Sequence, residues 1–424
     1  MANARKVAVK ALTEVSNNKA YSNIILNKVF DNNPMNHTEK AFATALFYGV
    51  LDRKLSIDYI ISIFVKKGLK KITPITLEAL RIAVYQIYFM DKVPDSAAVN
   101  ESVNIVKASK ERFNASFVNG VLRNILREKP NLPSDDSIES LSVRYSCPKW
   151  IINSFVNDYG IDSAKKLLDA SLQKPPVTLR VNTVKITADE LINMLENDGL
   201  KAEKLNENAI NILSGIDVKD SKCYKQGLFH IQDLASQKSI EKLDLKPQMR
   251  VLDLCSAPGG KSFTAASIME NTGEILSFDL YEKRVELIDK GAKRLDFDII
   301  KVQVGDATEY KKEIGAFDAV ICDVPCSGLG VIRRKPEIKY KDIEDFKELQ
   351  SIQKKILENA SRYLKQNGKI LYTTCTLRCD ENENIVSDFL KNNNNFTLEY
   401  EKTYMPHIDG TDGFFCALLI KKQN

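Results

Sequence analysis

Apolar side chains recur at helical spacing through the first 130 residues. One face of the stretch 4–17 carries Val7, Ala11, Leu12 and Val15. The stretches 39–65, 76–90 and 116–126 continue the same spacing of three or four residues. Prolines at 74, 94 and 130 interrupt it. This pattern predicts an all-α helical bundle of about six or seven helices over residues 1–130.

A second pattern follows a polar, proline-containing linker at 129–137. The stretches 149–160 and 161–172 have helical spacing, whereas 177–183 alternates apolar and polar residues as a strand does. Thr187 is placed as the N-cap of a further helix. Short apolar runs at 209–213 and 227–233 predict more strands. Residues 138–240 are therefore expected to form a small α+β module.

Continuous apolar runs then alternate with helical segments. Strands are expected at 250–255, 274–279, 299–306, 317–323, 368–375 and 415–421, with helices at 282–295 and 345–364. Continuous runs are typical of strands buried on both faces, and their alternation with helices predicts a parallel, doubly wound sheet. The sequence thus predicts a multidomain chain whose residues 241–424 form an α/β, Rossmann-like domain.

Composition and charge restrict the location and the partners. No apolar run reaches the roughly 18 residues that span a bilayer, and the N-terminus lacks a secretory signal, so we expect a cytoplasmic protein without a membrane partner. The eight cysteines are expected to be free thiols, and their C-x-x-x-C spacings do not favour zinc or another metal. Residues 1–130 carry 20 Lys and Arg against 11 Asp and Glu. This excess indicates either an anionic partner such as nucleic acid or a well-solvated helical surface.

The stretch 250–268 combines a strand, a loop of small residues and a helix. Gly259 and Gly260 let a ligand approach the backbone closely. A nucleoside-triphosphate loop is disfavoured because Cys255 stands where that motif has its first glycine. Asp279 ends the second strand, 19 residues after Gly260, where related folds bind ribose hydroxyls. Asp306 ends the third strand, where it could reach an adenine amino group.

One loop and successive acids at strand ends suit a ligand with a single adenosine, and S-adenosyl-L-methionine is such a ligand. The alternative is that these aspartates only cap helices. The predicted cofactor-binding residues are Cys255, Ser256, Ala257, Pro258, Gly259, Gly260, Lys261, Asp279, Asp306 and Asp323. Asp323 could contact either the cofactor or a substrate base, and Lys261 could polarise the base or steer the cofactor carboxylate.

Three motifs together resemble those of a known family. They are "DLCSAPGGK" at 253–261, "DVPCSGLGVIRRKPEIK" at 323–339, and "TTCTL" at 373–377 followed by "ENE" at 381–383. The chain resembles RNA cytosine-5 methyltransferases of the RsmB/Sun/Fmu type. This resemblance implies a NusB-like helical domain, a small middle module and a Rossmann-like methyltransferase core. Val324 and Thr376 depart from the usual alanine and serine, and neither change removes a reactive group.

The chemistry that the resemblance implies explains two strand-end thiols. Cytosine C5 becomes nucleophilic only after a thiolate adds to C6, and a base must then remove the C5 proton so that the thiol can leave. Cys326 lies in a Pro-Cys motif, which DNA enzymes use for attack, whereas Cys375 lies in a Thr-Cys motif. The resemblance to the RNA enzymes implies that Cys375 is the nucleophile and that Cys326 assists release of the product.

The resemblance also implies the substrate, which is cytosine C5 in 16S ribosomal RNA or in a small-subunit assembly intermediate, at the site corresponding to cytosine 967. Two alternatives stay open: a tRNA cytosine-5 methyltransferase, and a non-catalytic RNA-binding or assembly protein. Arg333, Arg334 and Lys335 could hold phosphates, or they could form a solvated basic turn. A second basic group, here called the lysine cluster, comprises Lys66, Lys67, Lys70 and Lys71.

Overall fold

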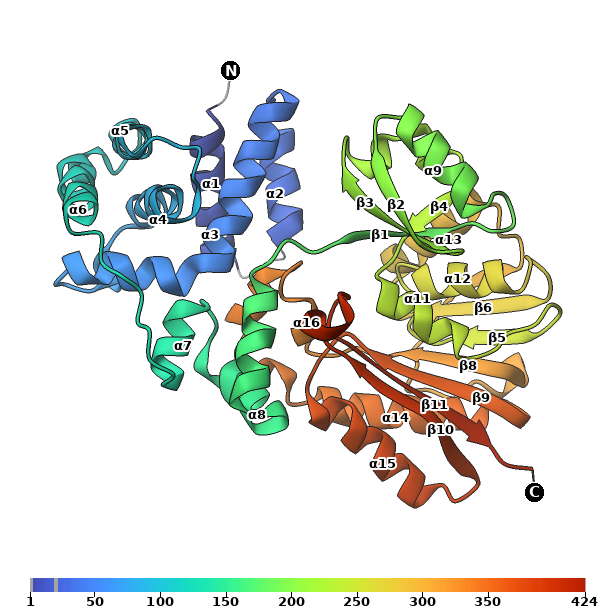
Figure 1. Ribbon diagram of the computed structural model, residues 1–424. Helices are drawn as coiled ribbons and strands as arrows, with labels where there is room; N and C mark the ends of the chain where they lie inside the picture. Colours follow the sequence, from blue (N-terminus) through green and yellow to red (C-terminus); the bar gives the residue numbers. More distant parts are fainter. Residues whose placement is uncertain (1–2, 19–21, 424) are drawn as a thin grey trace. The chain divides into compact units, whose positions relative to one another are not determined.

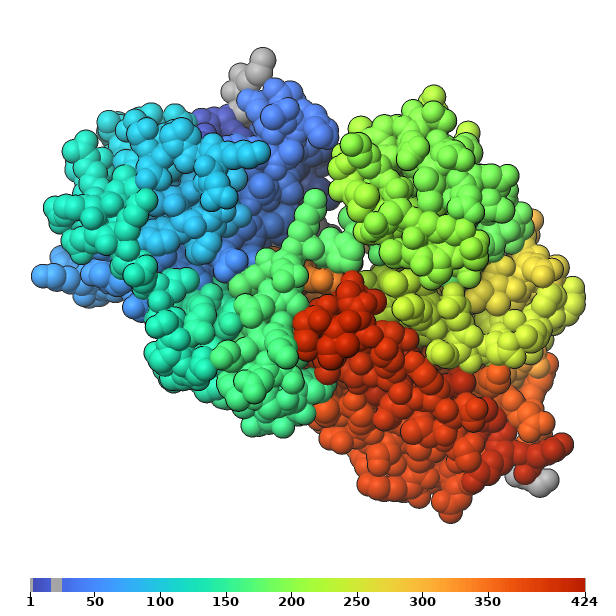
Figure 2. All heavy atoms as spheres, viewed as in Figure 1, coloured from blue at the N-terminus to red at the C-terminus, as the bar shows by residue number. Residues whose placement is uncertain are grey.

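The computed structural model describes residues 3–18 and 22–423, and the remaining residues are grey in Figures 1 and 2. Contacts within the chain divide it into two compact units. The first consists of the described part of Met1–Gln173 together with Ile332–Lys341. The second consists of Lys174–Val331 and the described part of Asp342–Asn424.

The first unit is entirely helical, as the spacing of its apolar residues predicted (Figure 1). Its α-helices are α1 (Ala4–Asn18), α2 (Ser22–Asp31), α3 (His37–Phe64), α4 (Pro74–Phe89), α5 (Asp95–Lys107), α6 (Ala115–Glu128), α7 (Ile138–Arg144) and α8 (Lys149–Ser171). Short 3-10 helices occur at η1 (Leu69–Lys71), η2 (Arg112–Asn114) and η6 (Pro336–Tyr340). Buried apolar residues of α1 to α6 form one core cluster. No described helix is both long and apolar enough to cross a membrane.

The segment Ile332–Lys341 packs within the helical unit. Lys339 is 1% exposed, and its Nζ lies 2.8 Å from both Oδ1 and the main-chain oxygen of Asp52. The hydroxyl of Tyr340 donates to the carbonyl of Leu51 over 2.7 Å. Burial of an ammonium group requires such a charged and hydrogen-bonded partner. This segment is therefore a fixed part of the helical unit.

Helices α7 and α8 also group with the N-terminal helices, although the sequence assigned them to a module over 138–240. The predicted linker 129–137 contains no described helix or strand and lies between α6 and α7. The boundaries 1–130, 138–240 and 241–424 stay predictions.

The second unit begins with a small antiparallel sheet. Its strands are β1 (Val177–Val181), β2 (Lys201–Asn206), β3 (Ala209–Ser214) and β4 (Phe229–Ile231), in the order β2-β3-β1-β4. Helix α9 (Ala188–Asn197) begins at the predicted N-cap, where Thr187 and Glu190 form a capping box. The short helix α10 (Lys222–Lys225) precedes β4.

A seven-stranded sheet forms the centre of the second unit. Its strands are β5 (Arg250–Asp253), β6 (Glu274–Asp279), β7 (Ile300–Val304), β8 (Phe317–Asp323), β9 (Leu364–Thr374), β10 (Phe396–Tyr404) and β11 (Phe414–Lys421), in the order β10-β11-β9-β8-β5-β6-β7. The strands from β9 to β7 pair in parallel, as predicted. The sheet is nevertheless mixed, because β11 pairs antiparallel with both β9 and β10.

Strand β10 was not predicted from the sequence. Its middle residues are largely exposed or half-buried, so it lacks the continuous apolar run that marks the other strands of this sheet. It lies at the edge of the sheet, where one partner strand is sufficient. In the space-filling view the C-terminal residues, which include β10 and β11, form one unbroken area on the surface of this unit (red, Figure 2).

Helices cover both faces of the large sheet (Figure 1). One face packs against α11 (Leu234–Glu241), α12 (Gly260–Ile268) and α13 (Glu282–Leu295). The other packs against α14 (Leu349–Arg362) and α15 (Glu383–Asn392). Successive strand residues alternate between the two cores, with Val251 in one and Leu252 in the other. This two-sided burial leaves the ends of the strands as the place for polar side chains.

Candidate active site

The carboxyl ends of five parallel strands lie along one edge of the sheet. Strand pairing places Thr373 opposite Asp323, and Asp253 between Ile321 and Ser277. Asp279 pairs with Val304 on the next strand. The last residues of these strands and the segments that directly follow them include all the residues predicted for cofactor binding and catalysis. Ligands of open α/β sheets bind at this kind of edge.

The glycine loop between β5 and α12 is held against β6. Ser256 donates its main-chain N–H and its hydroxyl to the carbonyl of Phe278, over 2.8 Å and 2.9 Å. Gly259 has a φ of +108°, and a Cβ there would lie 2.3 Å from the ring of Phe263. No other residue fits this position without displacing that ring. The glycine therefore lets the loop turn tightly into α12.

Two of the predicted acids also organise turns. Asp279 is 2% exposed, and its carboxylate accepts from the main-chain N–H groups of Ala257 and Tyr281, both over 3.3 Å. Arg284 Nη1 lies 3.4 Å from the same carboxylate. The N-cap of α13 is Tyr281, so Asp279 is not itself a helix cap. Asp306 lies two residues beyond β7.

The carboxylate of Asp306 accepts from the main-chain N–H and the hydroxyl of Thr308, over 2.8 Å and 2.7 Å. This is a local turn of the kind that Asp side chains commonly form. Both bonds go to Oδ1, so the turn is compatible with a ligand contact at Oδ2.

Asp323 is half-buried and forms a polar link between the loop and the neighbouring strand. Its Oδ2 lies 2.7 Å from Nζ of Lys261, which is 8% exposed and lies over the ring of Phe414. Its Oδ1 accepts from the hydroxyl of Thr373 over 2.9 Å. Both predicted residues are thus brought together, with the ammonium group neutralising the carboxylate.

Asp253 is a site residue that the sequence did not single out. It is fully buried at the end of β5, and Ser262 donates to its Oδ2 over 2.6 Å. Its Oδ1 has no hydrogen-bond partner among the described residues. Burial raises the pKa of Asp253 to about 7, because desolvation disfavours the charged carboxylate.

The thiols of Cys326 and Cys375 lie together at the sheet edge. Their Sγ atoms are 3.4 Å apart, and both side chains are partly exposed. The hydrogen bond with Cys375 and burial raise the pKa of Cys326 well above its usual range. Among the other cysteines, Cys147, Cys322 and Cys416 are fully buried, as expected of thiols that act as small apolar side chains.

A close backbone contact fixes the Cys375 loop. Gly330 donates its N–H to the carbonyl of Cys375, and Gly413 donates to the carbonyl of Gly330, each over 2.9 Å. A Cβ on Gly330 would lie 2.0 Å from the carbonyl oxygen of Gly413 and 2.8 Å from that of Cys375. Only glycine allows this approach. The loops that carry the two thiols are therefore joined through their main chains.

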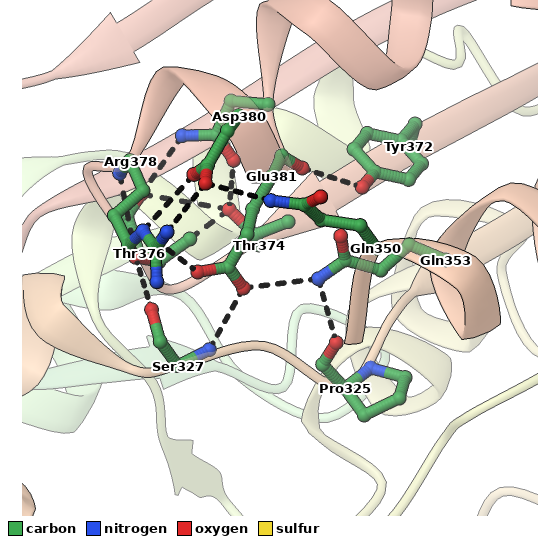
Figure 3. A network of polar contacts seen from close by, with 11 residues as sticks. Pro325, Ser327, Gln350, Gln353, Tyr372, Thr374, Thr376, Arg378, Asp380 and Glu381 are labelled. Carbon is green, nitrogen blue, oxygen red and sulfur yellow. Dashed lines mark hydrogen bonds and ion pairs between the residues drawn. The ribbon is translucent and has the colours of Figure 1, made fainter. Parts of the chain in front are cut away.

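A buried polar network contacts the loops that carry the two thiols, and sequence reasoning missed it. Figure 3 shows this network. It centres on Glu381, which is 1% exposed, and includes Gln353 and Arg378. The motif "ENE" was noted in the sequence, but a charged residue in a polar stretch gives no sign that it is buried. Gln353 lies 28 residues before Glu381, so only the fold brings the two together.

The predicted basic groups belong to the helical unit. Arg333, Arg334 and Lys335 lie in the segment Ile332–Lys341. The lysine cluster follows α3 and extends into η1, and all four side chains are exposed. Among the described residues, these four lysines have no ion-pair partner. No group of three or more His, Cys, Asp or Glu within 3–18 and 22–423 could hold a metal ion.

Known protein families match the N-terminal, middle and C-terminal parts of the chain. Residues 240–420 match the family described as 16S rRNA methyltransferase RsmB/F, and residues 2–127 match the NusB family. Residues 147–219 match the RsmF/B-like ferredoxin-like domain. The solved structure of PH0851 is similar over 99% of this chain and 98% of its own, with a TM-score of 0.83 and 27% identity. The structure of NSun6 from Pyrococcus horikoshii with SFG, at 20% identity and a TM-score of 0.61, shares the fold over 65% of this chain and 99% of its own.

Two curated relatives are similar over almost their full length. A probable ribosomal RNA small subunit methyltransferase B of Bacillus subtilis is 36% identical, with 99% of this chain and 98% of the relative covered. A ribosomal RNA small subunit methyltransferase B of Photorhabdus laumondii is 31% identical, with 99% of each covered. The predicted NusB-like and Rossmann-like domains are confirmed by these matches. The chain belongs to the RsmB family of methyltransferases.

Proposed function

We propose that this protein transfers a methyl group from S-adenosyl-L-methionine to C5 of a cytosine in 16S ribosomal RNA. The observation that carries the proposal is the pair of thiols, 3.4 Å apart, at the same sheet edge as the glycine loop and the strand-end acids. A methyltransferase that acts on an oxygen or nitrogen atom needs no thiol. Cytosine C5 does, because an unactivated ring carbon is a poor nucleophile.

The residues at the edge fit the proposed cofactor. Gly259 and Gly260 leave the loop backbone uncovered by a Cβ, and Asp279 and Asp306 offer carboxylates at successive strand ends. Asp323 completes this row beside Lys261. When bound, S-adenosyl-L-methionine supplies the electrophilic methyl group that C5 takes up. The acids would accept hydrogen bonds from ribose hydroxyls and the adenine amino group.

The two thiols have different roles in this proposal. The Cys375 thiolate adds to C6 and forms a carbon–sulfur bond, and the ring electrons move toward C5. After methylation, a base removes the C5 proton, and the carbon–sulfur bond breaks to return the Cys375 thiolate. Cys326 assists this release.

The proposal also specifies which RNA and which cytosine are methylated. The two relatives are named for ribosomal RNA of the small subunit, and the exposed lysine cluster and the NusB-family match support an RNA partner. We propose the site corresponding to cytosine 967, in naked RNA or in an assembling subunit. The target base must leave any stack to reach Cys375.

Methyl transfer from labelled S-adenosyl-L-methionine tests the proposal. We expect label in 16S ribosomal RNA or in the small subunit, located at a single cytosine by base-resolution mapping, and none in transfer RNA. Cys375→Ala should abolish both methylation and any covalent adduct. Cys326→Ala should methylate and then accumulate a protein–RNA adduct that survives denaturing electrophoresis.

Each alternative predicts a different result. Label in transfer RNA alone would identify a tRNA cytosine-5 methyltransferase. RNA binding without methyl transfer would indicate a non-catalytic assembly protein. An adduct from Cys375→Ala and none from Cys326→Ala would make Cys326 the nucleophile.

A further inference from the structure

Glu381 is a buried carboxylate with no part in the chemistry proposed above. It ends η8 (Cys379–Glu381), six residues after Cys375, and is 1% exposed. A carboxylate so deeply buried needs several hydrogen-bond donors around it. The identity of these donors indicates what the residue does (Figure 3).

One oxygen of Glu381 holds the loop of Cys326 from both sides. Oε2 accepts from the main-chain N–H of Ser327 over 2.9 Å and from Nε2 of Gln353 over 3.0 Å. The same Nε2 donates to the carbonyl of Pro325 over 2.9 Å. The residues directly before and after Cys326 are therefore tied, one directly and one through Gln353, to a single oxygen atom.

The rest of Glu381 is fixed to the chain around Cys375. Its carbonyl accepts from the hydroxyl of Tyr372, in β9, over 2.7 Å. Its N–H donates to the carbonyl of Arg378 over 3.1 Å, and Nε of Arg378 lies 3.7 Å from Oε1. The hydroxyls of Ser327 and Thr376 add a direct link between the two loops, 2.8 Å long. The carboxylate thus joins two loops that come from different strands.

We propose that Glu381 is a positioning residue that sets the separation of the Cys326 and Cys375 thiols and thereby the rate at which methylated RNA is released. The link to RNA release rests on the proposed function, whereas the link to thiol separation does not. Without the Oε2 acceptor, the Ser327 N–H and the Gln353 amide lose their shared partner. The Cys326 loop then keeps its main-chain bond through Gly330 and the contact of Ser327 with Thr376, but the residues on either side of Cys326 are held less tightly, and the thiol can move away from Cys375.

Disulfide trapping measures the separation of the thiols without RNA. Diamide takes up two protons and two electrons as two thiols become a disulfide, and mass spectrometry of the digested protein identifies the Cys326–Cys375 pair. The wild-type pair should oxidise rapidly, since its sulfur atoms are 3.4 Å apart. Glu381→Ala should slow this pair by roughly 10- to 100-fold, the scale of effect expected for a displacement of about 1 Å.

Two variants separate positioning from a general structural role. Glu381→Gln keeps an oxygen acceptor in place and should oxidise at nearly the wild-type rate. Asp380→Asn is the matched control, because Asp380 belongs to the same network through Arg378 and Gln350 but has no described bond to the Cys326 loop. A wild-type rate in Glu381→Ala would overturn the proposal. Equal slowing in Glu381→Gln or in Asp380→Asn would also overturn it.

The thermal midpoint of each variant shows whether it is folded. Should Glu381→Ala fail to fold, Gln353→Ala carries the test, because it removes only the bond to Pro325 and one donor to Oε2. It should slow formation of the Cys326–Cys375 disulfide less than tenfold but measurably. A wild-type rate for this variant would then overturn the proposal.

The RNA assay tests the second half of the proposal. Folded Glu381→Ala should methylate RNA but accumulate the covalent adduct, as a milder form of Cys326→Ala, and Glu381→Gln should restore release. If wild type does not methylate and Cys326→Ala traps nothing, the proposed function fails, while the disulfide result still decides the positioning role. If both cysteine variants behave as proposed and Glu381→Ala releases RNA normally, the role in release is overturned.

Discussion

Replacing Asp279 by Asn tests the cofactor site with little change in shape. The carboxylate is held by two long hydrogen bonds, each 3.3 Å, and by an ion pair with Arg284, whose side chain is 50% exposed. The carboxylate is buried, but its ion-pair partner is half exposed and 3.4 Å away, so this pair adds about 1 kcal/mol or less, and the variant should remain folded. A hydrogen bond between a ribose hydroxyl and a charged carboxylate is worth about 1.5–3 kcal/mol. Cofactor affinity should therefore fall roughly 10- to 150-fold.

Isothermal titration calorimetry with S-adenosylhomocysteine measures this loss directly. Asp289→Asn is the matched control, because Asp289 lies on the same helix α13 but pairs only with the exposed Lys293, 2.7 Å away. The control should bind as the wild type does. If Asp279→Asn retains wild-type affinity, Asp279 has no contact with the ribose and its only role is to order the loop at Ala257. A thermal midpoint measured in parallel verifies that any lost affinity is not lost folding.

Three further predictions concern stability and RNA binding. Burial raises the pKa of Asp253 to about 7, so the folded protein holds this proton more tightly than the unfolded chain does, and stability should fall as the pH rises from about 4 to 7. Between pH 5 and 8 the thermal midpoint of Asp253→Asn should fall less steeply than that of the wild type. Equal slopes would contradict the raised pKa of Asp253. Gly330→Ala should destabilise the protein by about 1–3 kcal/mol in urea, because its Cβ would overlap two carbonyl oxygens. Replacing the lysine cluster with glutamines should reduce the slope of log affinity against log salt by roughly 0.7–0.9 per lost phosphate contact, and an unchanged slope would exclude the cluster from the RNA interface.

The sequence predicted the strands best where burial is two-sided. Strands β6 and β8 and helix α13 have the predicted bounds, because apolar runs and amphipathic periodicity depend on neighbours in the chain. Strand β10 was missed because its exposed face removes the apolar signal. The antiparallel direction of β11 was missed for a related reason, since a run of buried residues is the same in either direction.

In the candidate site, too, the sequence predicted the features that are local in the chain and missed those that depend on the fold. Motifs predicted Cys326, Cys375 and the glycine loop, because each motif is local in sequence, and the structure brings them to one edge. The ion pair of Lys261 with Asp323 joins residues 62 positions apart, and Gln353 reaches Glu381 from another helix. Such pairs leave no pattern in a single sequence. The predicted roles of the site residues stay predictions until the variants above are measured.

The segment Ile332–Lys341 has a consequence for how this protein can be divided. It packs with the helical unit, yet both of its ends continue into the second unit, so the two units are joined by three peptide connections, at 173–174, 331–332 and 341–342. No single cut in the chain yields both units intact. A fragment beginning at residue 174 would leave Lys339 without Asp52 and would expose a cationic side chain that the full chain buries. The helical unit is therefore not a detachable module, and its contribution to RNA binding is better measured by surface substitutions than by truncation.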